Sequence, residues 1–131
     1  MALNPQYLEI GQQFAKQYYT LFDDPNCRAQ LVNLYSPDQS LMSFEGSQHQ
    51  GAQKIMEKFA ALTFTKIQHI VTTVDCQPMF DGGILINVVG QLKTDDDPVH
   101  GFSQTFVLKP VPTGQGFFCQ HDCFRLAIHN V

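Results

Sequence analysis

The chain has 131 residues, of which 44% are hydrophobic and 15% are charged. This composition excludes an intrinsically disordered chain, and the length fits one domain, which we place at residues 1–131. The net charge is −4, and no two Lys or Arg residues are neighbours, so the basic stripe that nucleic-acid binding needs is missing. The longest apolar run, residues 84–89, is interrupted by Asn87 and is far shorter than the ~20 residues of a membrane span.

The amino-terminal residues show neither the basic nor the apolar segment of a secretory signal. An intracellular, reducing compartment is therefore expected. The four cysteines, Cys27, Cys76, Cys119 and Cys123, are predicted to be free thiols there.

The first half of the chain has the periodicity of helices. Asn4 and Pro5 are typical of a helix start, and apolar residues then recur at helical spacing up to Asp24, where Pro25 disfavours further helix. A short second helix is predicted over residues 26–35 and a third over 52–62. Between them, residues 40–45 are predicted to form a short strand and the polar residues 46–51 a loop.

The second half has the composition of strands. Val, Ile, Thr and Phe are concentrated in residues 66–76, 84–92, 100–109 and 117–128. Turn residues separate these runs: Asp81-Gly82-Gly83, the acidic segment 93–98, and the segment 110–116. Helices followed by an antiparallel meander predict an α+β fold.

Alternation along the predicted strands makes both faces of the sheet partly apolar. Ile84, Ile86 and Val88 are expected on one face, and Leu85 and Val89 on the other. The last strand is expected to place Phe118, Phe124, Leu126 and Ile128 opposite Cys119, Cys123 and Ala127. Short helices can cover one face, and a symmetric partner is the simplest cover for the other, so we predict a homodimer packed through its sheets.

A metal site is weighed first among the candidate chemistries. Cys119, His121 and Cys123 are expected to share one face of the last strand. Residues two apart on a strand do so by default, and structural zinc sites usually place Cys pairs on tight turns. We therefore predict no metal and no cofactor.

Acid–base catalysis is the second candidate. Asp75 and Asp122 lie within predicted strands, where Asp is disfavoured, and a carboxylate and a His inside an apolar cavity could abstract a proton. The alternative, which the spacing favours, is that Asp122 pairs with Arg125 or a backbone N–H and that His69 is a satisfied core residue. The prediction is a protein that is not an enzyme.

The sharpest charge feature is the run Asp95-Asp96-Asp97. It is either a solvated hairpin tip or a docking site for Lys or Arg of a partner. Glu45, beside Phe44 and before Gly46, is a second candidate carboxylate next to an aromatic residue.

Five runs of the chain occur in a characteristic order and spacing: YYTLFD at 18–23, FEG at 44–46, FTKIQH at 64–69, VVGQLKTDDDP at 88–98 and DCFRLAIHN at 122–130. In these runs the chain resembles the nuclear transport factor 2 family over essentially its whole length. The resemblance implies a homodimeric, cone-shaped α+β fold with three N-terminal helices on a strongly bent, mostly antiparallel sheet. It also implies a carrier that binds Ran in its GDP form and Phe-Gly repeat nucleoporins, returns Ran to the nucleus, and occurs in cytoplasm and nucleus with enrichment at nuclear pores.

The resemblance also assigns roles to individual residues. An aromatic ring of Ran would enter the cavity while its lysines pair with rim carboxylates, which match Glu45, Asp95 and Asp97. Cavity or mouth positions match Phe44, Leu62, Phe64, Ile67 and His69, and Tyr7 matches the aromatic that holds Phe-Gly repeats. Positions in the cavity or at the dimer interface match Asn87, Thr105, Cys123 and Phe124.

The chain departs from the family pattern in two ways. Phe44 and Tyr7 stand where vertebrate members carry Trp, which keeps an aromatic ring at both positions. Asn87, Thr105 and Cys123 stand where those members carry Met, and smaller or more polar side chains are expected to make the cavity wetter.

Two other functions remain as alternatives. One is a related adaptor of the same fold that forms a heterodimer with an mRNA-export receptor, although such relatives generally lack the combined rim of Glu45, Asp95 and Asp97. The other is a cavity isomerase or dehydratase, which needs a base and an acid facing each other in the cavity.

Overall fold

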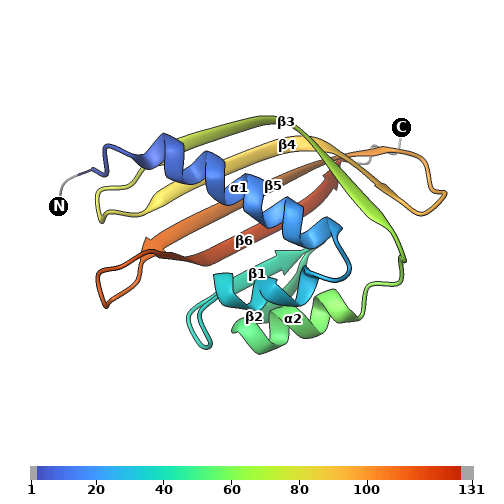
Figure 1. The fold of residues 1–131 in the computed structure, drawn as a ribbon, viewed down its shortest axis with the longest axis horizontal. Helices are drawn as coiled ribbons and strands as arrows, with labels where there is room; N and C mark the ends of the chain where they lie inside the picture. The colour runs from blue at the N-terminus through green and yellow to red at the C-terminus, as the bar shows by residue number, and fades with distance from the viewer. Residues whose placement is uncertain (1–2, 128–131) are drawn as a thin grey trace.

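The computed structural model describes residues 3–127, which form three helical segments packed on a six-stranded sheet (Figure 1). The helical segments are α1 (Tyr7–Asp23), the 3₁₀ helix η1 (Arg28–Leu34) and α2 (Ala52–Ala60). The strands are β1 (Leu41–Phe44), β2 (Ser47–Gln50), β3 (Ile67–Pro78), β4 (Ile84–Thr94), β5 (His100–Pro110) and β6 (Phe117–Ala127). The predicted α+β class is confirmed. None of the described helices is long and apolar enough to span a membrane.

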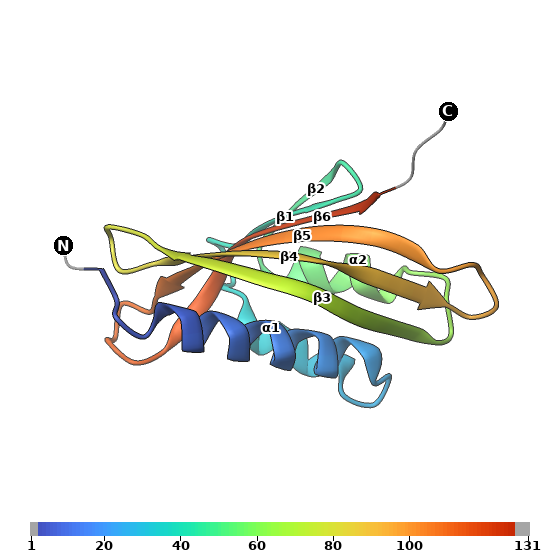
Figure 2. The same ribbon diagram turned by 90° about the horizontal axis from the view of Figure 1, so that it is seen from above.

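The strands lie in the order β2-β1-β6-β5-β4-β3. The β1–β6 pair is parallel and the other pairs are antiparallel, so the sheet is mostly antiparallel as expected. Helix α1 lies along one face of the curved sheet (Figure 2), where it contacts β3 and β4. Helix α2 contacts η1 and the edge strand β2. Between them, this face and the helices enclose the core.

The core follows the predicted alternation along β4 and β5. Ile84, Ile86 and Val88 are fully buried on the helix-covered face, together with Phe102 and Phe106 from β5. Rings from α1 complete this layer, since Tyr18 lies 4.9 Å from Phe106 between ring centroids in an edge-to-face arrangement. Leu85 and Val89 face the other side, as the alternation predicts.

The prediction of a loop over residues 46–51 is wrong, because Ser47–Gln50 forms the edge strand β2. Phe44 pairs with Ser47, so Glu45 and Gly46 alone make the turn, with φ angles of 52° and 87°. Two positive φ angles are what a two-residue type I′ hairpin needs. The strand is entirely polar, so hydrophobic alternation gave no signal for it.

The expected facing of residues along the last strand is wrong at its start. Val107 pairs with His121 but Leu108 pairs with Cys119, so β6 carries one extra residue, a β-bulge. The bulge reverses the facing of everything before it, because side chains alternate with a period of two. Cys119 is therefore fully buried while Cys123 is exposed, and these cysteines and His121 do not share a face. Ile128 lies outside the described residues.

The sheet bends where Gly90 of β4 pairs with Val71 of β3. A Cβ at Gly90 would lie 2.4 Å from the carbonyl oxygen of Ile70 and 3.1 Å from the Cα of Val71, so the strands approach too closely here for a side chain. The register of β3 shifts between Val71 and Thr73 at the same place. A bulge beside a glycine is a common way to bend a strand pair, and this bend curls the sheet around α1.

Candidate functional site

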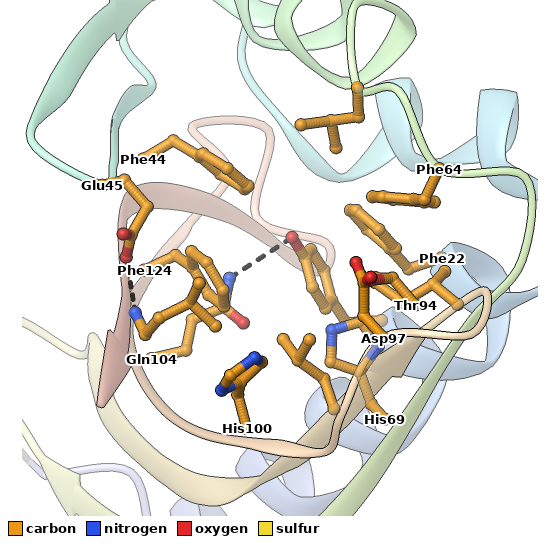
Figure 3. A pocket seen from close by; sticks show the side chains of 15 residues that line it. Phe22, Phe44, Glu45, Phe64, His69, Thr94, Asp97, His100, Gln104 and Phe124 are labelled. Atoms are coloured by element: carbon orange, nitrogen blue, oxygen red, sulfur yellow. Dashed lines mark hydrogen bonds between the residues drawn. The ribbon is translucent and has the colours of Figure 1, made fainter. Parts of the chain in front are cut away.

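The bent sheet and the helices leave an open cavity of about 290 Å³ beside the C-terminal end of α1 (Figure 3). That volume exceeds the roughly 150 Å³ of an apolar cavity that admits benzene, so an aromatic side chain fits. The walls are mostly apolar and come from every layer of the fold: Phe22 from α1, Phe44 from β1, Leu62 and Phe64 from the segment after α2, Ile67 from β3, Leu92 from β4, and Phe124 and Leu126 from β6.

The aromatic walls are held by contacts between rings. The rings of Phe44 and Phe124 are stacked with centroids 4.7 Å apart, which links β1 to β6 on one side of the cavity. On the other side Phe22 lies 6.5 Å from Phe64 and 5.0 Å from Phe59. Packed rings of this kind lose little entropy when a ligand binds, so the cavity is preformed.

Two exposed carboxylates stand at the mouth. Glu45 sits in the β1–β2 turn, where its Oε1 accepts the backbone N–H of Leu126 at 2.5 Å. Asp97 sits in the turn after β4, and its Oδ2 accepts a hydrogen bond from Thr94 Oγ1 at 3.3 Å. Within residues 3–127 neither carboxylate forms an ion pair, so each keeps oxygen lone pairs for a cation of a partner.

Asp95, the third expected rim carboxylate, does not line the cavity. Its Oδ1 accepts the backbone N–H groups of Lys66, at 2.8 Å, and of Thr65, at 3.1 Å. Asp95 therefore anchors the segment that carries Phe64, and its own side chain lies outside the cavity lining. Its positive φ of 47° is tolerated by Asp, whose short side chain bonds nearby backbone groups.

His69 lines the cavity as a satisfied residue. Its Nδ1 lies 2.6 Å from Asp23 Oδ1, and its backbone N–H donates to Asp23 Oδ2 at 2.9 Å. The imidazole packs against the rings of Tyr19 and Phe102, and the side chain is 4% exposed. The interpretation of His69 as a satisfied residue of the core is confirmed.

A buried polar network lies beneath the cavity. Gln104, which lines the floor, donates from Nε2 to Asp122 Oδ1 at 2.8 Å and to the Tyr18 hydroxyl at 3.3 Å. A dashed line in Figure 3 marks the bond between Gln104 and Tyr18. The Oε1 of Gln104 accepts the Tyr19 hydroxyl at 2.7 Å. Tyr35 donates to Asp122 Oδ2 at 2.8 Å. A fully bonded network of this kind fixes the floor in one arrangement.

Burial raises the pKa of Asp122 to about 6, and the hydrogen bonds from Gln104, Tyr35 and Tyr18 offset part of that rise. Burial also raises the pKa values of Tyr18 and Tyr35 well above 10, so both stay protonated donors at neutral pH. The prediction that Asp122 pairs with Arg125 or a backbone N–H is wrong: its partners are these tyrosines and Gln104.

The carboxylates considered as general bases are not in the cavity. Asp122 is bonded beneath the floor, and Asp75 is exposed on β3, paired in register with Asn87. In the described part of the chain no group of three or more His, Cys, Asp or Glu side chains is arranged to hold a metal ion.

The resemblance places Asn87, Thr105 and Cys123 in the cavity or at the dimer interface, and the cavity alternative is wrong because none of the three lines the cavity. They form a row across β4, β5 and β6, with Asn87 paired to Thr105 and Thr105 paired to Cys123. The row lies on the outer face, because the neighbours of Asn87 along β4 point into the core. Within the row, the Thr105 hydroxyl donates to Asn87 Oδ1 at 3.1 Å. Phe124, grouped with them, does line the cavity.

Sequence reasoning missed part of the lining: Tyr18, Phe22, Leu92, Thr94, His100, Gln104 and Leu126. Gln104 left a signal, since it is a polar residue between Phe102 and Phe106 at a position that alternation assigns to the core. His100 left none, because its place at the mouth depends on how β5 begins after the acidic turn. Tyr7 is half-buried at the start of α1, against the edge of the core.

Comparison with known proteins agrees with this geometry. Residues 10–126 match the family model described as "Nuclear transport factor 2 (NTF2) domain". A probable nuclear transport factor 2 from Caenorhabditis elegans is 47% identical over 133 residues, covering 99% of each chain. The chain belongs to the nuclear transport factor 2 family. The structure of nuclear transport factor 2 from Cryptosporidium parvum superposes with a TM-score of 0.88 at 41% identity, covering 96% of this chain and 98% of that one.

The fold itself is more widespread than the family. A putative scytalone dehydratase from Novosphingobium aromaticivorans has a TM-score of 0.73 at 12% identity, over 95% of this chain and 88% of that one. That likeness concerns the fold alone, so the nuclear transport factor 2 relatives and the site itself carry the functional argument.

Proposed function

We propose that this member of the nuclear transport factor 2 family is a homodimeric carrier that binds GDP-loaded Ran and Phe-Gly repeat nucleoporins and so mediates import of Ran into the nucleus. Such a carrier would occur in cytoplasm and nucleus and be enriched at nuclear pores. The observation that carries the proposal is the preformed aromatic cavity with Glu45 and Asp97 at its mouth, both without an ion-pair partner in the described chain.

The cavity suits a ring flanked by basic residues. Burying an aromatic side chain contributes roughly 1.5–3 kcal/mol, and each exposed rim ion pair adds about 1 kcal/mol or less. The rim pairs strengthen as the ring excludes water from the mouth, and the net charge of −4 favours approach of a basic partner. We propose that the partner's ring contacts a set of lining residues: Phe44, Leu62, Phe64, Ile67 and His69. Asp95 would act indirectly, by anchoring the segment that carries Phe64.

The experiment for this function is a titration of the chain with Ran loaded with GDP or with a GTP analogue. We expect saturable binding of the GDP form and at least tenfold weaker binding of the GTP form, because a conformational switch in Ran would present or hide the ring (about 1.4 kcal/mol per tenfold). Equal binding of the two forms, or none, would reject the assignment.

The homodimer is proposed on the outer face of the sheet. Val89 and Ile70 are 43% and 51% exposed there, beside the row of Asn87, Thr105 and Cys123. A second copy would cover this face isologously. Sedimentation at micromolar concentration should give a dimer, and Val89→Lys should give a monomer because it would bury a charge at the contact. A wild-type monomer under these conditions would contradict the proposal.

Nucleoporin binding is proposed at Tyr7. Tyr7→Ala should weaken binding of a Phe-Gly repeat peptide by about tenfold, because it removes most of an aromatic contact, while leaving Ran binding intact. Phe80→Ala serves as the control, since this ring is 77% exposed at the β3–β4 turn and lacks a role in the proposal. An unchanged peptide affinity for Tyr7→Ala would place the nucleoporin site elsewhere.

We also propose that the chain is not an enzyme. A base and an acid facing each other across the cavity would be needed. The nitrogen Nδ1 of His69 is bonded to Asp23, and the carboxylates of Asp75 and Asp122 lie outside the lining. The lining also holds Glu45, Asp97 and His100, and we assign the two carboxylates to the rim contacts of a carrier.

A further inference from the structure

Arg28 lies behind the aromatic wall of the cavity and does not line it. It begins η1, and its Nε donates to the carbonyl oxygen of Phe22 at 2.6 Å. That carbonyl belongs to the last turn of α1, whose oxygens lack partners within the helix. Arg28 thereby caps α1 with a cation at the negative end of the helix dipole.

The same guanidinium covers two rings of the cavity wall. Its Cζ lies 5.2 Å from the ring centroid of Phe22 and 5.3 Å from that of Phe64. Both distances are within the ~6 Å over which a cation is attracted to a ring face. Arg28 therefore bridges a ring fixed in a helix and a ring outside regular structure.

The nitrogen Nη2 of Arg28 is buried and has no hydrogen-bond partner among residues 3–127. A buried, unpaired donor on a charged group is costly, and the two ring faces are what offsets that cost here. If the ring of Phe64 moved away, the guanidinium would lose one of its two ring contacts. The position of Phe64 and the burial of Arg28 thus stabilise each other.

Phe64 needs such support because of where it lies. Residues 61–66 connect α2 to β3 without forming a helix or strand. The backbone N–H groups of Ala61 and Leu62 donate to carbonyl oxygens of α2, and those of Thr65 and Lys66 donate to the Asp95 carboxylate. Those bonds fix the backbone beside Phe64 but do not orient its ring. The ring itself lies 6.5 Å from the Phe22 ring between centroids and under the guanidinium of Arg28.

We propose that Arg28 is a positioning residue for the binding cavity: by capping α1 and lying over the rings of Phe22 and Phe64, it holds the wall against which a partner's ring packs. The link to binding rests on the proposed carrier function. The positioning of the ring does not, since it is a property of the free protein.

The test places 4-fluorophenylalanine at position 64 alone and records its ¹⁹F resonance in the wild type, Arg28→Met and Arg28→Lys. Met keeps apolar volume but loses the charge and the cap. Lys keeps the charge but not the planar fork. We expect Arg28→Met to move the resonance toward that of a solvent-exposed ring and Arg28→Lys to move it by a smaller amount. Binding of GDP-loaded Ran should weaken about fivefold in Arg28→Met, as expected for a lost cation–ring contact.

Ile84→Val is the matched control, because it loosens the core at the far end of β4 and leaves this wall untouched. An unmoved ¹⁹F resonance in Arg28→Met, or an equal movement in Ile84→Val, would overturn the positioning role. If Arg28→Met fails to fold, the displacement in Arg28→Lys decides in its place. Ring displacement in a protein that does not bind Ran would reject the carrier function and leave the positioning role standing.

Discussion

Glu45→Lys is expected to weaken binding of GDP-loaded Ran by about a hundredfold or more, as judged by calorimetric titration. The substitution removes a carboxylate at the cavity mouth and puts an ammonium where a partner's Lys or Arg is proposed to lie. Losing one attraction and adding one repulsion beside a water-excluded ring corresponds to about 3 kcal/mol. The fold should survive, because the main structural loss is the bond to the backbone N–H of Leu126, about 1 kcal/mol.

Glu57→Lys is the matched control for this experiment. It makes the same charge change on the exposed face of α2, where Glu57 pairs with Lys54 at 3.7 Å. We expect its affinity for Ran to stay within about twofold of the wild type, since surface charges away from the contact act only through a screened field. Equal losses in the two variants would indicate that net charge alone, and no specific rim contact, governs binding.

The contribution of Asp122 to the stability of the fold is expected to fall as pH rises from 4 to 7. The folded pKa of about 6 lies above the ordinary 3.8, so the folded state holds this proton over a pH range in which the unfolded chain has released it. The Asp122 contribution is therefore greatest below pH 4 and is lost as pH rises through 6, a change of about 2–3 kcal/mol. The neighbouring Tyr18, Tyr35 and Cys119 stay neutral throughout, because burial raises the pKa of each.

Urea unfolding of the wild type and Asp122→Asn at pH 4 and pH 7, at one protein concentration, isolates this effect. The difference between the two proteins in free energy of unfolding should change by that 2–3 kcal/mol between the two pH values, because the variant cannot titrate at this position. A difference that stays constant with pH would show that Asp122 has an ordinary pKa and that the network tolerates its charge.

Local patterns predicted much of the fold. The spacing of apolar residues located α1 and α2, and the alternation from Ile84 to Val89 assigned the apolar side chains of β4 to their faces. The all-polar strand β2 and the bulge in β6 were missed, because neither leaves a periodic signal. One extra residue in β6 was enough to misplace Cys119.

The site was less predictable, since a cavity is the space left by distant elements. Glu45 and Asp97 could be named from the family resemblance. The resemblance could not show that the carboxylate of Asp95, two residues before Asp97, accepts the backbone N–H groups of Thr65 and Lys66. The place of Asn87 was left open for a similar reason. Alternation alone puts Asn87 outside, and the resemblance left cavity and dimer interface open.

The central claim is that the partner enters this cavity, and the most direct test is to map its contact by amide chemical shifts of the isotope-labelled chain during titration with GDP-loaded Ran. We predict the largest changes around the mouth, at residues 44–45, 62–69 and 94–100, with Asn87, Thr105 and Cys123 unchanged on the outer face. Changes confined to the outer face, or saturable binding that leaves the mouth unshifted, would contradict the account.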